Sequence, residues 1–162
     1  MSKIVTIGGG TGQFTLLSGL KRVPHAELTA VVSMADSGGS SGRLRDELGA
    51  LPPGDVLKAL LALSDLPGKV ARELLQHRFT AGSLNGHTSG NMLLTMLASY
   101  SGSFLEAVHG LGDMLKVRGT VLPVTTGNIT LRARLQDGTV LVGETAIDVP
   151  TVAARSRIAE VW

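Results

Sequence analysis

An apolar run that ends in a glycine-rich loop is the feature that most restricts the fold of this chain. The apolar residues 4–7 are followed directly by Gly-Gly-Gly-Thr-Gly at 8–12, and a helical apolar pattern covers 13–20. A second apolar run at 28–34 completes a strand–helix–strand order. This order favours a right-handed parallel crossover. The sequence therefore predicts an α/β fold with a Rossmann-like parallel sheet flanked by helices.

Later patterns add helices and then change period. Helices are predicted over 56–63, 70–77, 90–100 and 104–115, the first two separated at Pro67-Gly68, with Asp55 and Ser103 as N-caps of the first and last. Apolar residues alternate over 129–135, and Asp137-Gly138 is a strong turn signal before 139–142. We therefore expect an antiparallel β-hairpin toward the C-terminal end, and the start of a further strand at 157–162. Residues 1–162 are predicted to form a single domain.

Composition narrows the function classes. With 162 residues, 43% apolar and 17% charged, the chain is long enough for one globular core. A net charge of +2 and an aromatic content of 3% argue against nucleic acid as a partner. The chain has no cysteine, which excludes disulfides and thiolate metal sites. No segment resembles a signal peptide or a membrane span, so we expect a cytoplasmic protein without a membrane partner.

The first glycine-rich loop is a candidate phosphate site. Glycine lets backbone N–H groups approach an anion, and a following helix adds the positive end of its dipole. The dinucleotide fingerprint is incomplete because Gln13 stands where its third glycine would be, and no Gly-Lys-Ser/Thr sequence is present. The alternatives are a tight turn without ligand and a capping role for the threonine. The candidate residues are Gly9, Gly10, Thr11 and Gly12.

The second loop follows the second predicted strand. Asp36 could hold a ribose hydroxyl or a metal, or could bond its own backbone in a turn. The glycines could form a nest of N–H groups on which Arg43 and Arg45 close, or the arginines could pair with Asp46 and Glu47. The candidate residues are Asp36, Ser37, Gly38, Gly39, Ser40, Ser41, Gly42 and Arg43.

A third polar loop, 86–91, precedes a predicted helix. His87 could bind phosphate, act as an acid–base group or be structural, and Asn91 could contact a ligand or cap the helix. The sequence has no His-Glu-x-x-His spacing and no carboxylate cluster, so no preformed metal site is predicted.

In order and spacing, five motifs resemble the 2-phospho-L-lactate transferase (CofD-like) family, and more closely its bacterial gluconeogenesis-factor branch. They are residues 7–12, 35–45 (Ala-Asp-Ser-Gly-Gly-Ser-Ser-Gly-Arg-Leu-Arg), 51–55 (Leu-Pro-Pro-Gly-Asp), 86–94 (Gly-His-Thr-Ser-Gly-Asn-Met-Leu-Leu) and 121–125 (Val-Leu-Pro-Val-Thr). The resemblance covers essentially the whole chain.

The resemblance implies a Rossmann-like fold that binds a nucleotide. In the transferase branch a phospholactyl group moves from a guanosine diphosphate carrier to a deazaflavin precursor with magnesium. Proteins of the bacterial branch bind UDP-sugars such as UDP-N-acetylglucosamine and are linked to gluconeogenic growth and cell shape. The same resemblance places Gly9 to Gly12 and Asp36 to Arg43 on the ligand, with His87 and Asn91 nearby.

Two departures from the family pattern bear on function. Ser37 replaces the second of two aspartates that the family often carries, which weakens the prediction of a metal. The family also continues past this chain with a further glycine- and serine-rich loop, so the chain is expected to hold roughly the N-terminal half of the binding machinery.

Four interpretations stay open at this stage. They are a UDP-sugar-binding regulator without catalysis, a phospholactyl-type transferase that uses a nucleoside diphosphate and Mg²⁺, a generic dinucleotide-binding domain, and a fragment that binds no ligand alone. The motif Pro52-Pro53-Gly54-Asp55 favours the regulator over the transferase, and the missing third glycine of the first loop disfavours the dinucleotide-binding domain. Apart from Mg²⁺ in the transferase reading, no cofactor is predicted. We also expect a homo-oligomer, since the edge where the absent half would dock should be apolar.

Overall fold

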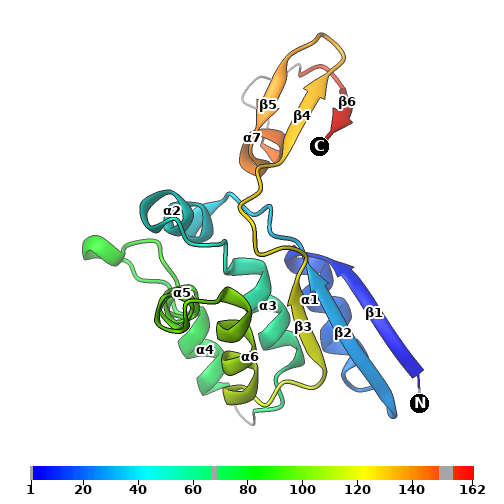
Figure 1. Cartoon of the computed structure of the whole chain (residues 1–162), viewed down its shortest axis with the longest axis vertical. Coiled ribbons are helices and arrows are strands. Elements are labelled where there is room, and N and C mark those ends of the chain that lie inside the picture. The colour runs from blue at the N-terminus through cyan, green and yellow to red at the C-terminus, as the bar shows by residue number, and fades with distance from the viewer. Residues whose placement is uncertain (1, 67–68, 150–154) are drawn as a thin grey trace.

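Three parallel strands form the sheet that positions the glycine-rich loops (Figure 1). The computed structural model describes residues 2–66, 69–149 and 155–162. Strand β1 (Ser2–Gly8) pairs with β2 (Ala26–Val32), and β2 pairs with β3 (Thr120–Pro123). The parallel pairing of β1 with β2 and the helix between them are those of a parallel crossover connection. The predicted Rossmann-like sheet is therefore confirmed.

The helices carry the polar loops at their starts. Between β1 and β3 lie α1 (Gly10–Leu20), α2 (Gly39–Leu48), α3 (Gly54–Leu63), α4 (Val70–Gln76), the 3₁₀ turn η1 (Gly82–Leu84), α5 (Ser89–Ser101) and α6 (Phe104–Met114). Ser103 caps α6 as predicted, because its side chain accepts from the Glu106 N–H. The predicted separation at Pro67-Gly68 lies outside the described residues.

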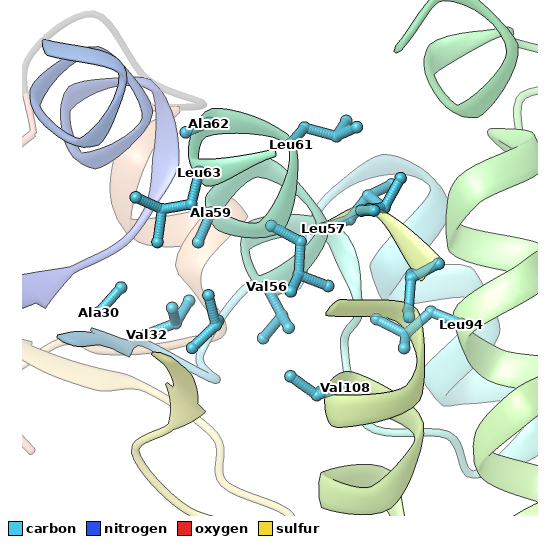
Figure 2. Close-up of a cluster of buried hydrophobic side chains, with 14 of the residues drawn as sticks. Ala30, Val32, Val56, Leu57, Ala59, Leu61, Ala62, Leu63, Leu94 and Val108 are labelled. Atoms are coloured by element: carbon cyan, nitrogen blue, oxygen red, sulfur yellow. The ribbon is translucent and has the colours of Figure 1, made fainter. Parts of the chain in front are cut away.

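The helix α3 forms the centre of the core (Figure 2). Eight of its ten residues are buried, so it is apolar on nearly every side rather than amphipathic. Its leucines and valine pack between the sheet residues Ala30 and Val32 and the helical residues Leu94 and Val108. Each such side chain contributes about 1.5–3 kcal/mol on burial. The core therefore fixes where the first turn of α3 lies.

Some helices begin earlier than the sequence pattern predicts, one helix was not predicted, and one predicted cap is wrong. Helix α1 starts at Gly10 instead of 13 and α3 at Gly54 instead of 56, whereas α2 (Gly39–Leu48) was not predicted at all, so much of each predicted glycine-rich loop is a helical first turn. Because glycine is a poor helix former, the glycines in these first turns gave no helical signal in the sequence. Asp55 is not an N-cap: α3 begins one residue before it, with Pro53 at the N-cap position.

The C-terminal part folds as a small antiparallel unit beyond the end of the parallel sheet (Figure 1). The strands β4 (Arg132–Leu135) and β5 (Val140–Val142) form the predicted hairpin, and Asp137 Oδ1 accepts from the Thr139 N–H at 2.9 Å in its turn. The strand β6 (Ile158–Val161) pairs with the other side of β4. This pairing extends the expected hairpin to three strands, with α7 (Glu144–Asp148) packed beside them.

One edge and one face of the parallel sheet remain open in the described part of the chain. There β1 pairs only with β2, and its side chains Val5 and Ile7 are 59% and 80% exposed. On the opposite face Gln13 of α1 is buried, and its Nε2 donates to Thr6 Oγ1 and to the Val31 carbonyl, both at 3.2 Å. Gln13, which stands where the dinucleotide fingerprint has its third glycine, thus joins α1 to the sheet by hydrogen bonds. No described helix is long and apolar enough to cross a bilayer.

Candidate functional site

Two adjoining pockets open where β1 and β2 end. The first, about 500 Å³, we call the acidic pocket; it is lined by Gly9, Gly10, Asp36, Asp55, Lys58, Glu144, Thr145 and Asp148 among others. The second, about 400 Å³, we call the helix-start pocket; its lining includes Asp36, Gly38, Gly39, Ser40, Ser41, Gly54, Lys58, Arg78, Thr88 and Asn91. Both have the size of a small-molecule site, and both lie at the carboxyl edge of the sheet, where open α/β sheets bind ligands.

A carboxylate lies against the first glycine-rich loop. A Cβ built on Gly9 would lie 2.4 Å from Asp55 Oδ2, so any other residue there would force the Asp55 carboxylate to move. Asp55 is 9% exposed, and its other oxygen accepts from Lys58 Nζ at 2.9 Å. The backbone at Gly9 therefore already has an acidic neighbour, unlike a simple phosphate loop.

The antiparallel unit adds two more carboxylates to the acidic pocket. Glu144 and Asp148 come from α7, and they line the pocket together with Asp36 and Asp55. Burial is the main cause that raises the pKa of the Glu144 carboxyl above its ordinary value, and the negative charges of Asp36, Asp148 and Asp55 add to it. A hydrogen bond from the Ser37 backbone acts in the opposite direction. The pocket is thus a region of negative charge.

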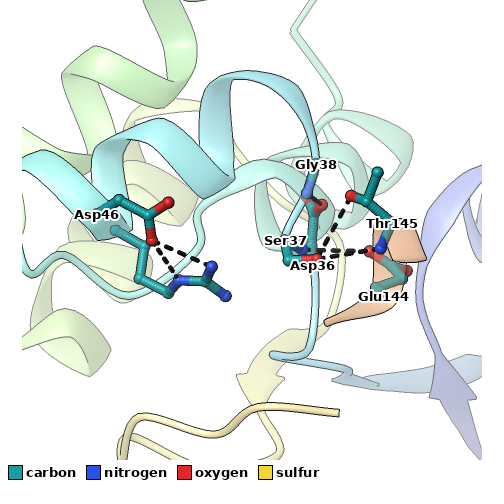
Figure 3. A network of polar contacts seen from close by, with 7 residues as sticks. Asp36, Ser37, Gly38, Asp46, Glu144 and Thr145 are labelled. Atoms are coloured by element: carbon teal, nitrogen blue, oxygen red, sulfur yellow. Dashed lines mark hydrogen bonds and ion pairs between the residues drawn. The ribbon is translucent and has the colours of Figure 1, made fainter. Parts of the chain in front are cut away.

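Ser37 joins the second loop to the antiparallel unit (Figure 3). Its backbone N–H donates to Glu144 Oε2 at 3.2 Å, and its Oγ accepts from the Thr145 N–H at 3.2 Å. The hydroxyl thereby satisfies an N–H of the first turn of α7 that has no partner within its own helix. Beside it, Asp36 Oδ1 accepts from the Gly38 N–H at 2.9 Å, the turn predicted as one alternative for this aspartate.

Three helices begin at the helix-start pocket. Gly39–Ser41 form the first turn of α2, Gly54 begins α3, and Thr88 is the N-cap of α5, accepting from the Asn91 N–H at 3.3 Å. Asn91 is therefore not the cap of its helix. Its side chain is 5% exposed, and the buried Oδ1 has no hydrogen-bond partner among the described residues.

His87 lies behind the first turn of α2. It is 2% exposed, and its Nδ1 lies 3.1 Å from Ser40 Oγ. Arg43 makes a second link between the same segments, donating from Nη1 to the Asn85 carbonyl at 2.7 Å. In this structure both side chains tie the loop before α5 to α2. Arg45 pairs with Asp46 at the surface, as one alternative predicted (Figure 3).

The remaining predicted residues lie around these contacts. Thr11 and Gly12 occupy the exposed first turn of α1, outside the residues that line either pocket. Gly42 is buried, and a Cβ there would lie 2.1 Å from the Ser37 carbonyl oxygen. The absence of a side chain at Gly42 thus lets the backbone of Ser37 pack closely against α2.

Sequence reasoning missed several pocket residues. Lys58 lies one turn after the start of α3 and belongs to both pockets, and Arg78 follows α4. The spacing of Asp55 and Lys58, three apart on a helix, was a readable sign of their ion pair. Glu144 and Thr145 gave no such sign, because their position depends on how the antiparallel unit packs.

The described residues form no group of three histidine or carboxylate side chains placed to hold a metal ion. Magnesium is commonly held by one or two carboxylates together with substrate phosphates. Asp36, which belongs to both pockets, fits that role when a diphosphate lies beside it. In that arrangement the ion would neutralise phosphate charge next to the carboxylates.

A parallel sheet with a helix crossover, and two pockets at its carboxyl edge, define a Rossmann-like α/β domain. Comparison of the sequence with protein families identifies the family within this class. The chain belongs to the CofD family: the family model described as 2-phospho-L-lactate transferase CofD matches residues 4–162.

Several bacterial proteins are similar to this chain. A protein named gluconeogenesis factor from Bacillus subtilis is 47% identical over 146 residues, which are 90% of this chain and 45% of that protein. A relative from Clostridium acetobutylicum is 46% identical over 99% of this chain and 35% of its own length. A crystal structure of a Bacillus halodurans protein matches with a TM-score of 0.92 and 43% identity, over 100% of this chain and 51% of that one. The chain thus spans about a third to a half of the length of these relatives.

Proposed function

We propose that this chain binds a nucleotide diphosphate sugar of the UDP class and acts in the cytoplasm as a regulator of carbon metabolism and cell shape. One observation carries the proposal: the ends of β1 and β2 open into two adjoining pockets that share Asp36, Gly38 and Lys58. A ligand that reaches both pockets must be elongated and carry groups of different character. A nucleotide sugar has this form.

The relatives support the regulatory part of the proposal. Several of them are named gluconeogenesis factor, a name that denotes a role in carbon metabolism and no reaction. The resemblance of the loops to that branch adds UDP-N-acetylglucosamine as the probe of choice. Because the chain spans half or less of those proteins, we expect weaker binding than a complete site would give.

The acidic pocket favours a second candidate, a transferase that uses a nucleoside diphosphate donor. Its four carboxylates would repel a diphosphate unless Mg²⁺ accompanied it, and the family model carries the name of such an enzyme. Under this alternative, guanosine diphosphate would bind only with Mg²⁺.

Calorimetric titration separates the candidates. We would titrate the folded chain with UDP-N-acetylglucosamine, GDP and NAD, each with and without Mg²⁺. Saturable heat with the UDP-sugar alone supports the regulator. Binding of GDP that requires Mg²⁺ supports the transferase instead, and preference for NAD contradicts both.

A further inference from the structure

The two pockets differ in charge, and this difference gives the bound ligand a direction. The acidic pocket is lined by four carboxylates, Asp36, Asp55, Glu144 and Asp148, with Lys58 as the cation among its lining residues. The helix-start pocket is lined by one carboxylate, Asp36, and by two cations, Lys58 and Arg78. Lys58 lies between the two, paired with Asp55.

The backbone increases the difference in charge between the two pockets. Helices α2, α3 and α5, of ten, ten and thirteen residues, all begin at the helix-start pocket. The start of a helix carries partial positive charge and N–H groups without partners in the helix. At the starts of α3 and α5, the Gly54 N–H donates to Ser41 Oγ and the Asn91 N–H to Thr88 Oγ1, so these two helices contribute their dipoles. At the start of α2, Gly38 is the N-cap and has no capping side chain, so the N–H groups of that first turn are the ones open to an anion.

Asn91 is an independent sign of a ligand in this pocket. Its amide is 5% exposed and lines the pocket, and its Oδ1 lacks a hydrogen-bond partner among the described residues. Buried polar atoms nearly always have a partner. Rotation of the amide presents either the oxygen or the N–H₂ group, so it can accept from a ligand hydroxyl or donate to a phosphate oxygen.

The first glycine-rich loop, in contrast, is a poor place for free phosphate. The Asp55 carboxylate lies directly against the Gly9 backbone, where an anion would have to approach. Carboxylates accept hydrogen bonds from hydroxyl groups, which ribose and sugar rings supply in number. The acidic pocket therefore suits the hydroxyl-bearing part of the ligand.

We propose that the helix-start pocket is the anion subsite, which holds the phosphates against the starts of α2, α3 and α5 with Asn91, Lys58 and Arg78, while the acidic pocket holds sugar hydroxyls. The assignment of sugar hydroxyls to the acidic pocket rests on the proposed function. The anion subsite itself is testable with inorganic pyrophosphate alone.

The test is calorimetric titration with pyrophosphate in a buffer free of divalent cations. Asn91→Asp adds a negative charge to the subsite at nearly constant shape, and we expect affinity to fall about tenfold or more. Asp148→Asn removes a charge from the acidic pocket, and we expect a change of less than about twofold. The opposite pattern, a strong gain in Asp148→Asn and no loss in Asn91→Asp, would overturn the inference.

A second pair of variants tests the subsite without changing the buried Asn91, because a substitution there can also disturb the fold. Arg78 is an exposed side chain whose Nη1 donates to the Gly86 carbonyl; we expect Arg78→Met to fold and to weaken pyrophosphate binding about fivefold, whereas Arg132→Met, at an exposed position of β4, should leave it unchanged. Equal affinities for these two variants would contradict the subsite.

A parallel titration with UDP-N-acetylglucosamine separates the two proposals. If the nucleotide sugar binds but the pyrophosphate variants show no such pattern, the subsite is wrong and the proposed function stands. If pyrophosphate follows the pattern and the nucleotide sugar does not bind, the anion subsite stands and the UDP-sugar assignment fails. A folded chain that binds neither overturns both.

Discussion

The Nδ1 atom of His87 lies 3.1 Å from the Oγ of Ser40, with both residues buried. This contact joins the loop before α5 to the first turn of α2, and so holds two sides of the helix-start pocket at a fixed separation. His87 was predicted as a phosphate-binding or acid–base group, or as structural. The observed contact gives it a positioning role, whatever else it does when a ligand is present.

We expect His87→Ala to destabilise the fold. The change leaves the Ser40 hydroxyl without its partner in a buried place and opens a cavity, which together cost about 2–4 kcal/mol. Urea unfolding followed by circular dichroism measures this loss. His109→Ala, at an exposed position on α6, is the matched control and should change the free energy of unfolding by less than about 0.5 kcal/mol. Equal effects of the two changes would refute the role given to His87.

Alanine substitutions in the first glycine-rich loop should have opposite effects. At Gly9 the new Cβ meets Asp55 Oδ2, and we expect a loss of about 1–3 kcal/mol in the free energy of unfolding. At Gly12 nothing lies within 4 Å, and alanine in the first turn of α1 should stabilise by up to about 1 kcal/mol. Denaturant midpoints would compare the two. Similar losses at both positions would mean that the Gly9–Asp55 contact is not what requires glycine.

The sequence predicted most of the fold but only part of the site. The apolar runs of β1 and β2 and the turn signal at Asp137-Gly138 are local, so their strands were predictable. The helix starts were not, because glycine and serine have low helix propensity and their first turns form through tertiary packing on the core.

The same distinction applies to the site. Residues 36–43 stand out by composition, and the structure brings Asp36 and Gly38 to both pockets. Glu144 meets Ser37 across a sequence separation of 107 residues, and no local pattern announces such a contact. The orphan oxygen of Asn91 likewise becomes visible only once its surroundings are packed.

The burial of Glu144 among other carboxylates predicts a pH dependence. Since burial and neighbouring carboxylates raise the pKa of Glu144 when the chain is folded, ionisation of this group is less favourable in the folded state than in the unfolded chain. Its favourable contribution to stability is complete below the ordinary value of 4.5 and is lost as pH rises through the raised pKa.

Glu144→Gln removes this titration and keeps an oxygen that can accept from the Ser37 N–H. We expect the variant to be more stable than the parent chain at pH 7, with the difference shrinking as pH falls toward about 4.5. Thermal unfolding over this range measures the difference. A constant offset between the two proteins, or a parent chain that is the more stable one at pH 7, would contradict the assignment.

The open edge of β1 predicts self-association. Within the described part of the chain this strand pairs on one side only, and Val5 and Ile7 are exposed beside the free edge. A second copy can cover it by pairing edge to edge. We expect light scattering to give a mass above the 16.8 kDa of one chain. Ile7→Lys should lower that mass, and Tyr100→Lys, 93% exposed on α5, should not. A monomer at all concentrations would exclude this surface as an interface.

The central claim is a nucleotide-sugar site built around Asp36, the carboxylate that both pockets share. The most direct test is calorimetric titration of UDP-N-acetylglucosamine into the parent chain and into Asp36→Ala, with circular dichroism to show that both are folded. The account predicts saturable binding by the parent chain and a loss of about tenfold or more in the variant. No binding by the folded parent chain, or equal affinity in both proteins, would contradict it.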